Sequence, residues 1–199
     1  MPDRTVKRMS VLPRAVFLPA VILFLLFLAR PVSSAEETSA VPGKYSHAIQ
    51  RISLNYGINP RFVQALIWRE SRFSANATGA HGEIGLMQIK METARDWAKK
   101  HNRPVPFRDQ VYGVELNLSI GIWHLDQAMR NWEGYPDQAK LSLLEYNVGR
   151  TALLRCLAHH DGDVEALLHA YRSHSYPDDI LAKFVEYSRM GQKDLACYP

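Results

Sequence analysis

The sequence is poor in the features that mark several protein classes. Only two of its 199 residues are cysteine, which excludes a disulfide-rich scaffold, and its 11 glycines and 11 prolines are too few for a collagenous or low-complexity chain. Alternating β-branched patterns are nearly absent, so no strand longer than a few residues is predicted. Phosphate loops, nucleophile elbows and dinucleotide fingerprints are absent as well. These absences leave a globular domain built mainly from helices.

The longest apolar run is also too short for a stable membrane span. Residues 15–29 form an unbroken apolar run, whereas a helix that crosses a bilayer needs about 20 residues. Four basic residues precede the run, and the small residues Ser33, Ser34 and Ala35 follow it, as at a signal peptidase site. We therefore predict that residues 1–35 are a secretory signal peptide and that the chain is exported to the periplasm. The alternative is an uncleaved segment that anchors the chain to the inner membrane.

A basic surface is missing once this leader is set aside. The formal net charge is +4, but the leader holds five of the basic residues and one acid, so 19 basic and 19 acidic residues remain. A nucleic-acid-binding protein needs an excess of Lys and Arg to neutralise phosphates. We therefore expect no nucleic-acid partner.

The rest of the chain shows helical periodicity almost throughout. After a polar lead-in at residues 36–43, residues 44–199 are predicted to form one domain, of mainly α class with at most a minimal β-hairpin. The expected helices cover residues 45–56, 60–71, 92–101, 111–132, 137–146, 151–158, 164–171 and 178–190. Residues 72–82 are rich in Gly, Ala, Ser and Asn and are expected to form a loop.

Glu70 interrupts an apolar stripe in the second of these helices. Val63, Leu66, Ile67 and Glu70 share one helix face, so the carboxyl group is expected on the side that faces the core. Burial and the negative end of the helix dipole both favour a protonated carboxyl group, which is what a general acid requires. The alternative is a helix-terminal glutamate that turns out to solvent beside a neighbouring arginine.

Three ordered motifs decide between these interpretations. They are Glu70-Ser71 at a helix end, the turn from Gly85 to Gln88 that reads GLMQ, and Tyr146-Asn147 followed by Gly149. Together they resemble the catalytic domain of the lytic transglycosylases, the SLT family of lysozyme-like enzymes. The resemblance implies a lysozyme-like helical fold. It also implies cleavage of the β-1,4 bond between N-acetylmuramic acid and N-acetylglucosamine in peptidoglycan, without a cofactor or metal.

The resemblance also implies residue roles. Glu70 matches the acid/base glutamate, which protonates the leaving oxygen and then accepts the muramic acid 6-hydroxyl proton, leaving a 1,6-anhydro sugar. The phenol of Tyr146 is expected to hydrogen-bond this carboxylate. The residues expected to bind the substrate are Ser71, Gly85, Met87, Gln88, Tyr146 and Asn147.

Glu83 opens a second possibility. It lies two residues before Gly85, where hen-type lysozymes carry an aspartate, and it is interpreted either as a second catalytic carboxylate or as an exposed loop acid. A second working carboxylate would favour ordinary hydrolysis.

A non-catalytic alternative is a peptidoglycan-binding or assembly factor. Small members of this family often open the wall for a secretion or conjugation apparatus, so such a partner is a further hypothesis.

Cys156 and Cys197 are candidates for a disulfide. In an oxidising compartment the pair would close a long loop and stabilise the fold by roughly 3–4 kcal/mol in the chain-entropy model. The alternative is two unpaired thiols.

The neighbouring His159 and His160 lack a zinc-ligand spacing, so no metal site is predicted. Asn117-Leu118-Ser119 matches a glycosylation sequon, a pattern short enough to arise by chance.

Overall fold

The computed structural model describes residues 45–171 and 175–193. The predicted leader, the lead-in at residues 36–43 and Cys197 lie outside these ranges, so the signal peptide and the disulfide stay predictions. Within the described ranges no helix is both long and apolar enough to cross a membrane. The helices in these ranges are α2 (Ser46–Asn55), α3 (Pro60–Ser71), α4 (Met91–Lys100), α5 (Arg108–Val111), α6 (Val114–Asn131), α7 (Gln138–Val148), α8 (Arg150–His159), α9 (Val164–Ala170) and α10 (Tyr176–Lys193).

The predicted fold class is confirmed. Helices dominate the described part of the chain, and its β-structure consists of two isolated bridges, which join Ile84 to Thr78 and to Ile89. The ends of α3 follow from local chemistry: the Asn59 side chain accepts a hydrogen bond from the Arg61 N–H at 2.9 Å, and Pro60 opens the first turn. The helix ends where Arg72 adopts a left-handed conformation, with φ 51°.

One helix boundary was wrong. Residues 111–132 were expected to form one helix, but the chain is extended at Gly113, between α5 and α6. In a continuous helix the Val111 carbonyl would accept the N–H of Glu115. Instead it accepts the side-chain amide of Asn117 at 2.9 Å. The hydrogen bond from the Asn117 side chain to the Val111 carbonyl therefore ends the helix at a point where the apolar periodicity predicts that it continues.

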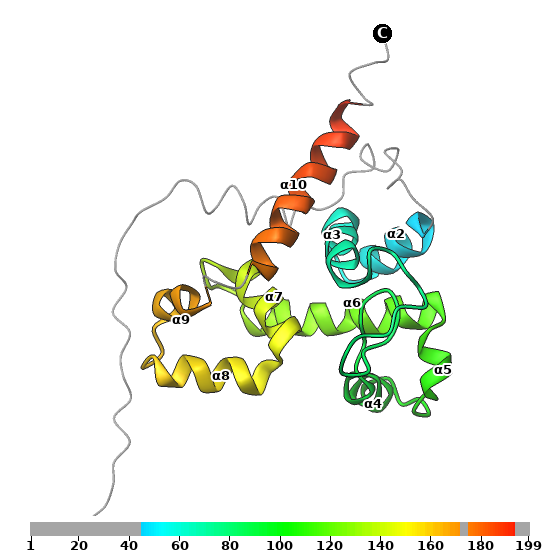
Figure 1. The fold of residues 1–199 in the computed structure, drawn as a ribbon, viewed down its shortest axis with the longest axis horizontal. Coiled ribbons are helices and arrows are strands. Elements are labelled where there is room, and N and C mark those ends of the chain that lie inside the picture. Colours follow the sequence, from blue (N-terminus) through cyan, green and yellow to red (C-terminus); the bar gives the residue numbers. More distant parts are fainter. Residues whose placement is uncertain (1–44, 172–174, 194–199) are drawn as a thin grey trace, which may run out of the picture.

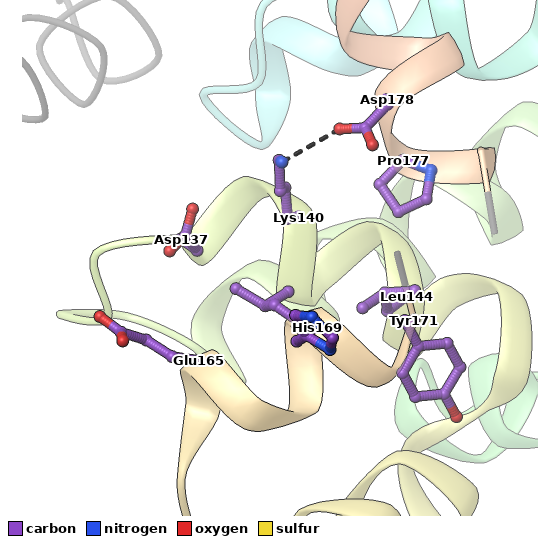
Figure 2. A pocket seen from close by; sticks show the side chains of 9 residues that line it. Asp137, Lys140, Leu144, Glu165, His169, Tyr171, Pro177 and Asp178 are labelled. Atoms are coloured by element: carbon purple, nitrogen blue, oxygen red, sulfur yellow. Dashed lines mark ion pairs between the residues drawn. The ribbon is translucent and has the colours of Figure 1, made fainter. Parts of the chain in front are cut away.

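Two groups of buried side chains hold the helices together. The main core joins α2, α3, α4, α6 and α10 with the segment 84–89, and the long α6 runs through the middle of the molecule (Figure 1). Phe62 of α3 and Phe184 of α10 meet edge to face in it, with ring centroids 5.5 Å apart. The second core joins α7, α8 and α9, and its buried members are Trp132, Leu141, Leu144, Leu153 and Leu167. The C-terminal end of α3 lies against the first turn of α10, which also contacts α7 through the ion pair of Asp178 and Lys140 (Figure 2).

Candidate active site

Glu70 occupies the last turn of α3, as the apolar stripe predicted. Val63, Leu66 and Ile67 on its stripe are fully buried, and Glu70 itself is only partly exposed. This burial raises the pKa of the Glu70 carboxyl group to about 7, because a charged carboxylate is poorly solvated there. Near neutral pH the group therefore exists in both protonation states, and it can both give and take a proton.

Tyr176 holds this carboxyl group. Its phenol donates a hydrogen bond to Oε1 of Glu70 from the first turn of α10. The same turn is fastened to α3 by Asp179, whose Oδ2 lies 3.3 Å from Nε of Arg69. Tyr176 is 7% exposed, and burial together with the nearby Glu70 raises its pKa well above the ordinary value of 10, so it stays a neutral donor.

The hydrogen bond expected from Tyr146 is therefore made by a different tyrosine. The single phenolic proton of Tyr146 goes to the carbonyl of Met87, at 2.8 Å. Its ring lies against the ring of His124, with centroids 5.0 Å apart, and burial lowers the pKa of that histidine to about 4, so the stack is uncharged at neutral pH. Tyr146 thus connects α7 to the turn next to Glu70. Sequence spacing offered no signal for Tyr176, which lies 106 residues from its partner.

The turn at residues 85–88 is fixed by a buried asparagine that the sequence analysis did not assign to the site. Asn117 on α6 donates to the carbonyls of Ile84 and Val111 and accepts the N–H of Met87, all within 2.9 Å. Gly85 has φ +71°, and a Cβ there would lie 2.5 Å from the Asn117 amide nitrogen. The turn therefore requires glycine at this position. Because Asn117 is fully buried, its sequon is not accessible.

The predicted substrate-binding residues of the turn differ in how far they are exposed to solvent. Met87 has 0% exposure and packs against Gly121 of α6, so its side chain belongs to the core rather than to a sugar-binding surface. Gly85 is buried as well. Gln88 is partly exposed, and its amide donates to the Gly85 carbonyl at 2.9 Å. The expectation of direct binding is thus corrected for Met87, whose side chain lies too deep to touch a ligand.

Two further predicted residues border the same region. The hydroxyl of Ser71 donates to the carbonyl of Leu86 at 2.8 Å, so it ties the end of α3 to the turn. Asn147 is exposed at the end of α7, directly after Tyr146. The structure therefore brings Glu70, Ser71 and Tyr146 together around one turn and leaves the Asn147 side chain open to solvent.

Glu83 lies in the loop before this turn, with 16% of its side chain exposed. Its Oε2 accepts the N–H of His81 at 3.0 Å. Hydrogen bonds from its own backbone N–H and from that of His81 lower the pKa of Glu83 below its ordinary value, so it is ionised at neutral pH. Its negative charge also contributes to the raised pKa of Glu70. The loop thus places a fixed anion near a carboxyl group that can hold a proton.

Glu145, which precedes Tyr146, is a second buried glutamate with a different environment. It is 3% exposed and accepts hydrogen bonds from the side chains of Asn131 at 2.7 Å, Trp132 at 2.8 Å and Arg150 at 3.1 Å. These donors come from the end of α6, the residue after it and the start of α8. The carboxylate therefore joins three segments, and its oxygens are occupied.

Among the described residues, no group of three or more His, Cys, Asp or Glu side chains could hold a metal ion.

Comparisons with known proteins agree with this arrangement. Residues 47–166, more than half of the chain, match the family described as the transglycosylase SLT domain. A membrane-bound lytic murein transglycosylase C of Glaesserella parasuis is 30% identical over 118 residues, which are 56% of this chain and 32% of that protein. The corresponding protein of Haemophilus influenzae is 27% identical over 143 residues, 69% of this chain and 39% of its own length. The chain thus spans well under half of these relatives.

Solved structures show the same fold. The 70 kDa soluble lytic transglycosylase of Escherichia coli superposes with a TM-score of 0.64 at 23% identity, over 75% of this chain and 25% of that one. The lytic transglycosylase Slt of Pseudomonas aeruginosa gives 0.60 at 22% identity, over 80% and 26% of the two chains. These likenesses confirm the predicted lysozyme-like helical fold class.

Proposed function

The chain belongs to the transglycosylase SLT domain family, and on that premise we propose that it is an exported peptidoglycan lytic transglycosylase with Glu70 as its single acid and base. The observation that carries this proposal is the environment of Glu70: a carboxyl group with a pKa of about 7, held by one neutral phenol at the end of a helix. The substrate is the β-1,4 bond between N-acetylmuramic acid and N-acetylglucosamine.

The first step is protonation of the leaving group. Protonated Glu70 gives its proton to the glycosidic oxygen as the bond from the muramic acid anomeric carbon to that oxygen breaks. Positive charge develops on the anomeric carbon, and the Glu70 carboxylate left by the proton transfer balances it, with the ionised Glu83 as a minor contributor. The N-acetylglucosamine end leaves with a new hydroxyl group.

The second step closes a ring within the muramic acid. The 6-hydroxyl oxygen attacks the anomeric carbon, and the Glu70 carboxylate accepts the hydroxyl proton, which returns the enzyme to its starting state. The products are a 1,6-anhydromuramic acid end and the released strand, and no water is consumed. A pKa near the working pH suits both steps, since the same group must first lose a proton and then regain one.

Hydrolysis is the rival outcome, because an ionised carboxylate stands near the acid. Against it, Glu83 is turned back onto its own loop: Oε2 accepts the His81 N–H, and a Cβ on Gly79 would collide with the same oxygen. A carboxylate committed to its loop is poorly placed to activate water or to form a covalent intermediate. The arrangement therefore supports one proton-transferring group rather than two.

Mass spectrometry of the soluble products from purified peptidoglycan tests the proposal, with Glu70→Gln digested in parallel. We expect products lighter by one water, ending in anhydromuramic acid, and a loss of turnover of about 10²-fold or more in the variant. Reducing-end products would instead show a hydrolase. No products from the wild type would favour the peptidoglycan-binding or assembly role beside an envelope secretion or conjugation apparatus.

A further inference from the structure

The segment 99–108, which runs from the end of α4 to the start of α5, carries the two most exposed large apolar side chains of the described residues. Phe107 is 78% exposed and Val105 is 51% exposed, while Pro106 between them is partly buried. Single apolar residues are common on protein surfaces, but two so close together form an apolar surface that the fold leaves uncovered. The pair therefore favours an apolar contact with something outside the chain.

The backbone holds this segment in one shape without using either side chain. The Arg103 N–H donates to the carbonyl of Ala98 at 2.8 Å, at the end of α4. The Phe107 N–H donates to Oε1 of Gln110 at 2.8 Å, at the start of α5. Two prolines between these anchors fix φ at two more positions. A protrusion that is already ordered loses little conformational entropy when it binds a partner.

Basic residues surround the apolar pair. The segment contains Lys99, Lys100, Arg103 and Arg108 and no acid, although residues 36–199 as a whole hold equal numbers of basic and acidic residues. All four residues are exposed, and none of them forms an ion pair within the described ranges. The nearest acid along the chain is Asp109, the residue that follows. The segment thus combines a local positive charge with exposed apolar surface.

The segment lies at the edge of the molecule, beside the end at which α6 begins (Figure 1). Nη1 of Arg108 donates to the carbonyl of Gly82 at 3.0 Å, so the segment is fastened to the loop that carries Glu83. A partner bound to the segment is therefore held close to the loop that precedes the reactive turn.

The combination of charge and apolar surface selects the partner. Anionic groups on a polysaccharide or a nucleic acid would pair with the lysines and arginines, but Val105 has no ring to stack on a sugar or a base. An anionic bilayer contacts both kinds of side chain. Its phosphates pair with Lys and Arg, and apolar side chains enter the boundary between headgroups and acyl chains.

We propose that the segment 99–108 is a docking surface for an anionic phospholipid membrane. Phe107 and Val105 insert at the interface, and the basic residues around them pair with the lipid phosphates. This contact is separate from the predicted N-terminal leader, and it does not depend on the proposed reaction.

A tryptophan substitution at the tip reports insertion locally. Phe107→Trp in the full chain is mixed with vesicles of equal parts phosphatidylglycerol and phosphatidylcholine, whose brominated acyl chains quench tryptophan fluorescence. The wild type gives the signal of the four native tryptophans. Leu154→Trp, at an exposed position on α8, reports a surface outside the segment. We expect the fluorescence added at position 107 to be quenched and that added at position 154 to be unaffected.

The two positions are compared in chains that share the same leader, so the leader cannot produce a difference between them. Vesicles of phosphatidylcholine alone should quench the signal at position 107 more weakly, because they lack the anionic headgroups. Absence of quenching at position 107, or equal quenching at positions 107 and 154, would overturn the proposal.

Charge variants in the Phe107→Trp background test the basic residues. Lys99→Gln with Arg103→Gln should raise the lipid concentration for half-maximal quenching about tenfold or more, since each Lys or Arg near an anionic surface contributes about fivefold. Arg155→Gln with Arg189→Gln is the matched control, because it removes the same charge from two exposed positions elsewhere. We expect it to change that concentration by less than about twofold. Equal shifts in the two double variants would overturn the proposal.

Soluble glycan strands and DNA are tested as competing partners in the same assay. A response of the Phe107→Trp fluorescence to either of them, with none to the vesicles, would reject the membrane. Vesicle docking is measured without turnover, so its failure leaves the proposed transglycosylase untouched, and a lack of glycan cleavage leaves the docking surface untouched.

Discussion

Two buried glutamates near helix ends, Glu70 and Glu145, differ in how completely their oxygens are satisfied. Glu145 accepts three hydrogen bonds, one of them from a guanidinium group, and ties α6, α7 and α8 together. Within the described ranges Glu70 accepts a bond from a single neutral phenol, and burial is the main cause of its raised pKa. Full satisfaction makes a carboxylate part of the scaffold, whereas partial satisfaction leaves it able to exchange a proton.

The comparison predicts first that Glu70 makes folding stability depend on pH. Its pKa is about 7 in the folded protein and near the ordinary 4.5 when unfolded, so the folded state binds the extra proton between these values. The contribution of Glu70 to the free energy of unfolding should therefore fall as pH rises from about 4.5 to 7, by at most about 3 kcal/mol, whereas His124, with its lowered pKa, contributes with the opposite sign in wild type and variant alike. Denaturant unfolding of the wild type and Glu70→Gln at several pH values measures the Glu70 contribution as the difference between the two proteins. An equal pH dependence in both proteins would contradict the prediction.

Glu145→Gln tests the other member of the comparison. An amide NH₂ in place of one oxygen would face the N–H groups of Trp132 or Asn131 and lose the charge partner of Arg150. We expect a loss of about 2 kcal/mol in the free energy of unfolding. Chemical denaturation measures it, with the exposed Glu186→Gln as the control. A stability equal to that of wild type would show that the three donors contribute nothing.

Tyr176→Phe removes the one hydrogen bond that the described residues donate to the Glu70 carboxyl group. That bond lowers the pKa of Glu70, so without it the pKa should rise and the basic limb of the pH–rate profile should move to higher pH. We expect kcat to fall about tenfold from lost positioning. Tyr187→Phe, on the same helix, is the control. A lower kcat with an unmoved pH profile would indicate a purely structural role.

Glu83→Gln should have the smallest effect. The carboxylate is occupied by its own loop, and its charge acts on Glu70 from a distance. We expect activity within about threefold of wild type, because an amide oxygen can still accept the backbone N–H bonds. Steady-state rates on purified peptidoglycan measure this. A loss of about 10²-fold, typical of a group that takes part in proton transfer, would move the assignment to a two-carboxylate hydrolase.

The local periodicity of apolar residues predicted most of the helices and the position of Glu70. The stripe through Val63 and Ile67 placed the acid on the core side of α3, and that placement is confirmed. The partners of the acid were not predictable in this way. Tyr176 reaches Glu70 only because α10 packs on α3, and Asn117 ends a helix by bonding to Val111. Spacing within one helix contains no information about such contacts between distant segments.

Met87 shows the same limit for roles taken from a motif. A motif gives the order of residue types but not which of them is exposed. Met87 was expected to contact a sugar, but its side chain is buried against Gly121 of α6 and belongs to the core. The disulfide between Cys156 and Cys197 and the leader at residues 1–35 stay predictions, because they involve residues outside the described ranges.

The hydrogen bonds of Asn117 also bear on how the protein folds. The turn at residues 85–88 belongs to no strand or helix, and its Met87 N–H is held by a side chain of α6. The other hydrogen bonds of the turn run to Ala77 and Ser71 and between Ile84 and Ile89, so docking of α6 completes its hydrogen bonding. In native-state hydrogen exchange, the Met87 amide should exchange through the same opening as the central amides of α6. The reactive centre is then assembled in the same cooperative step as the core, not as a loop added to a finished fold.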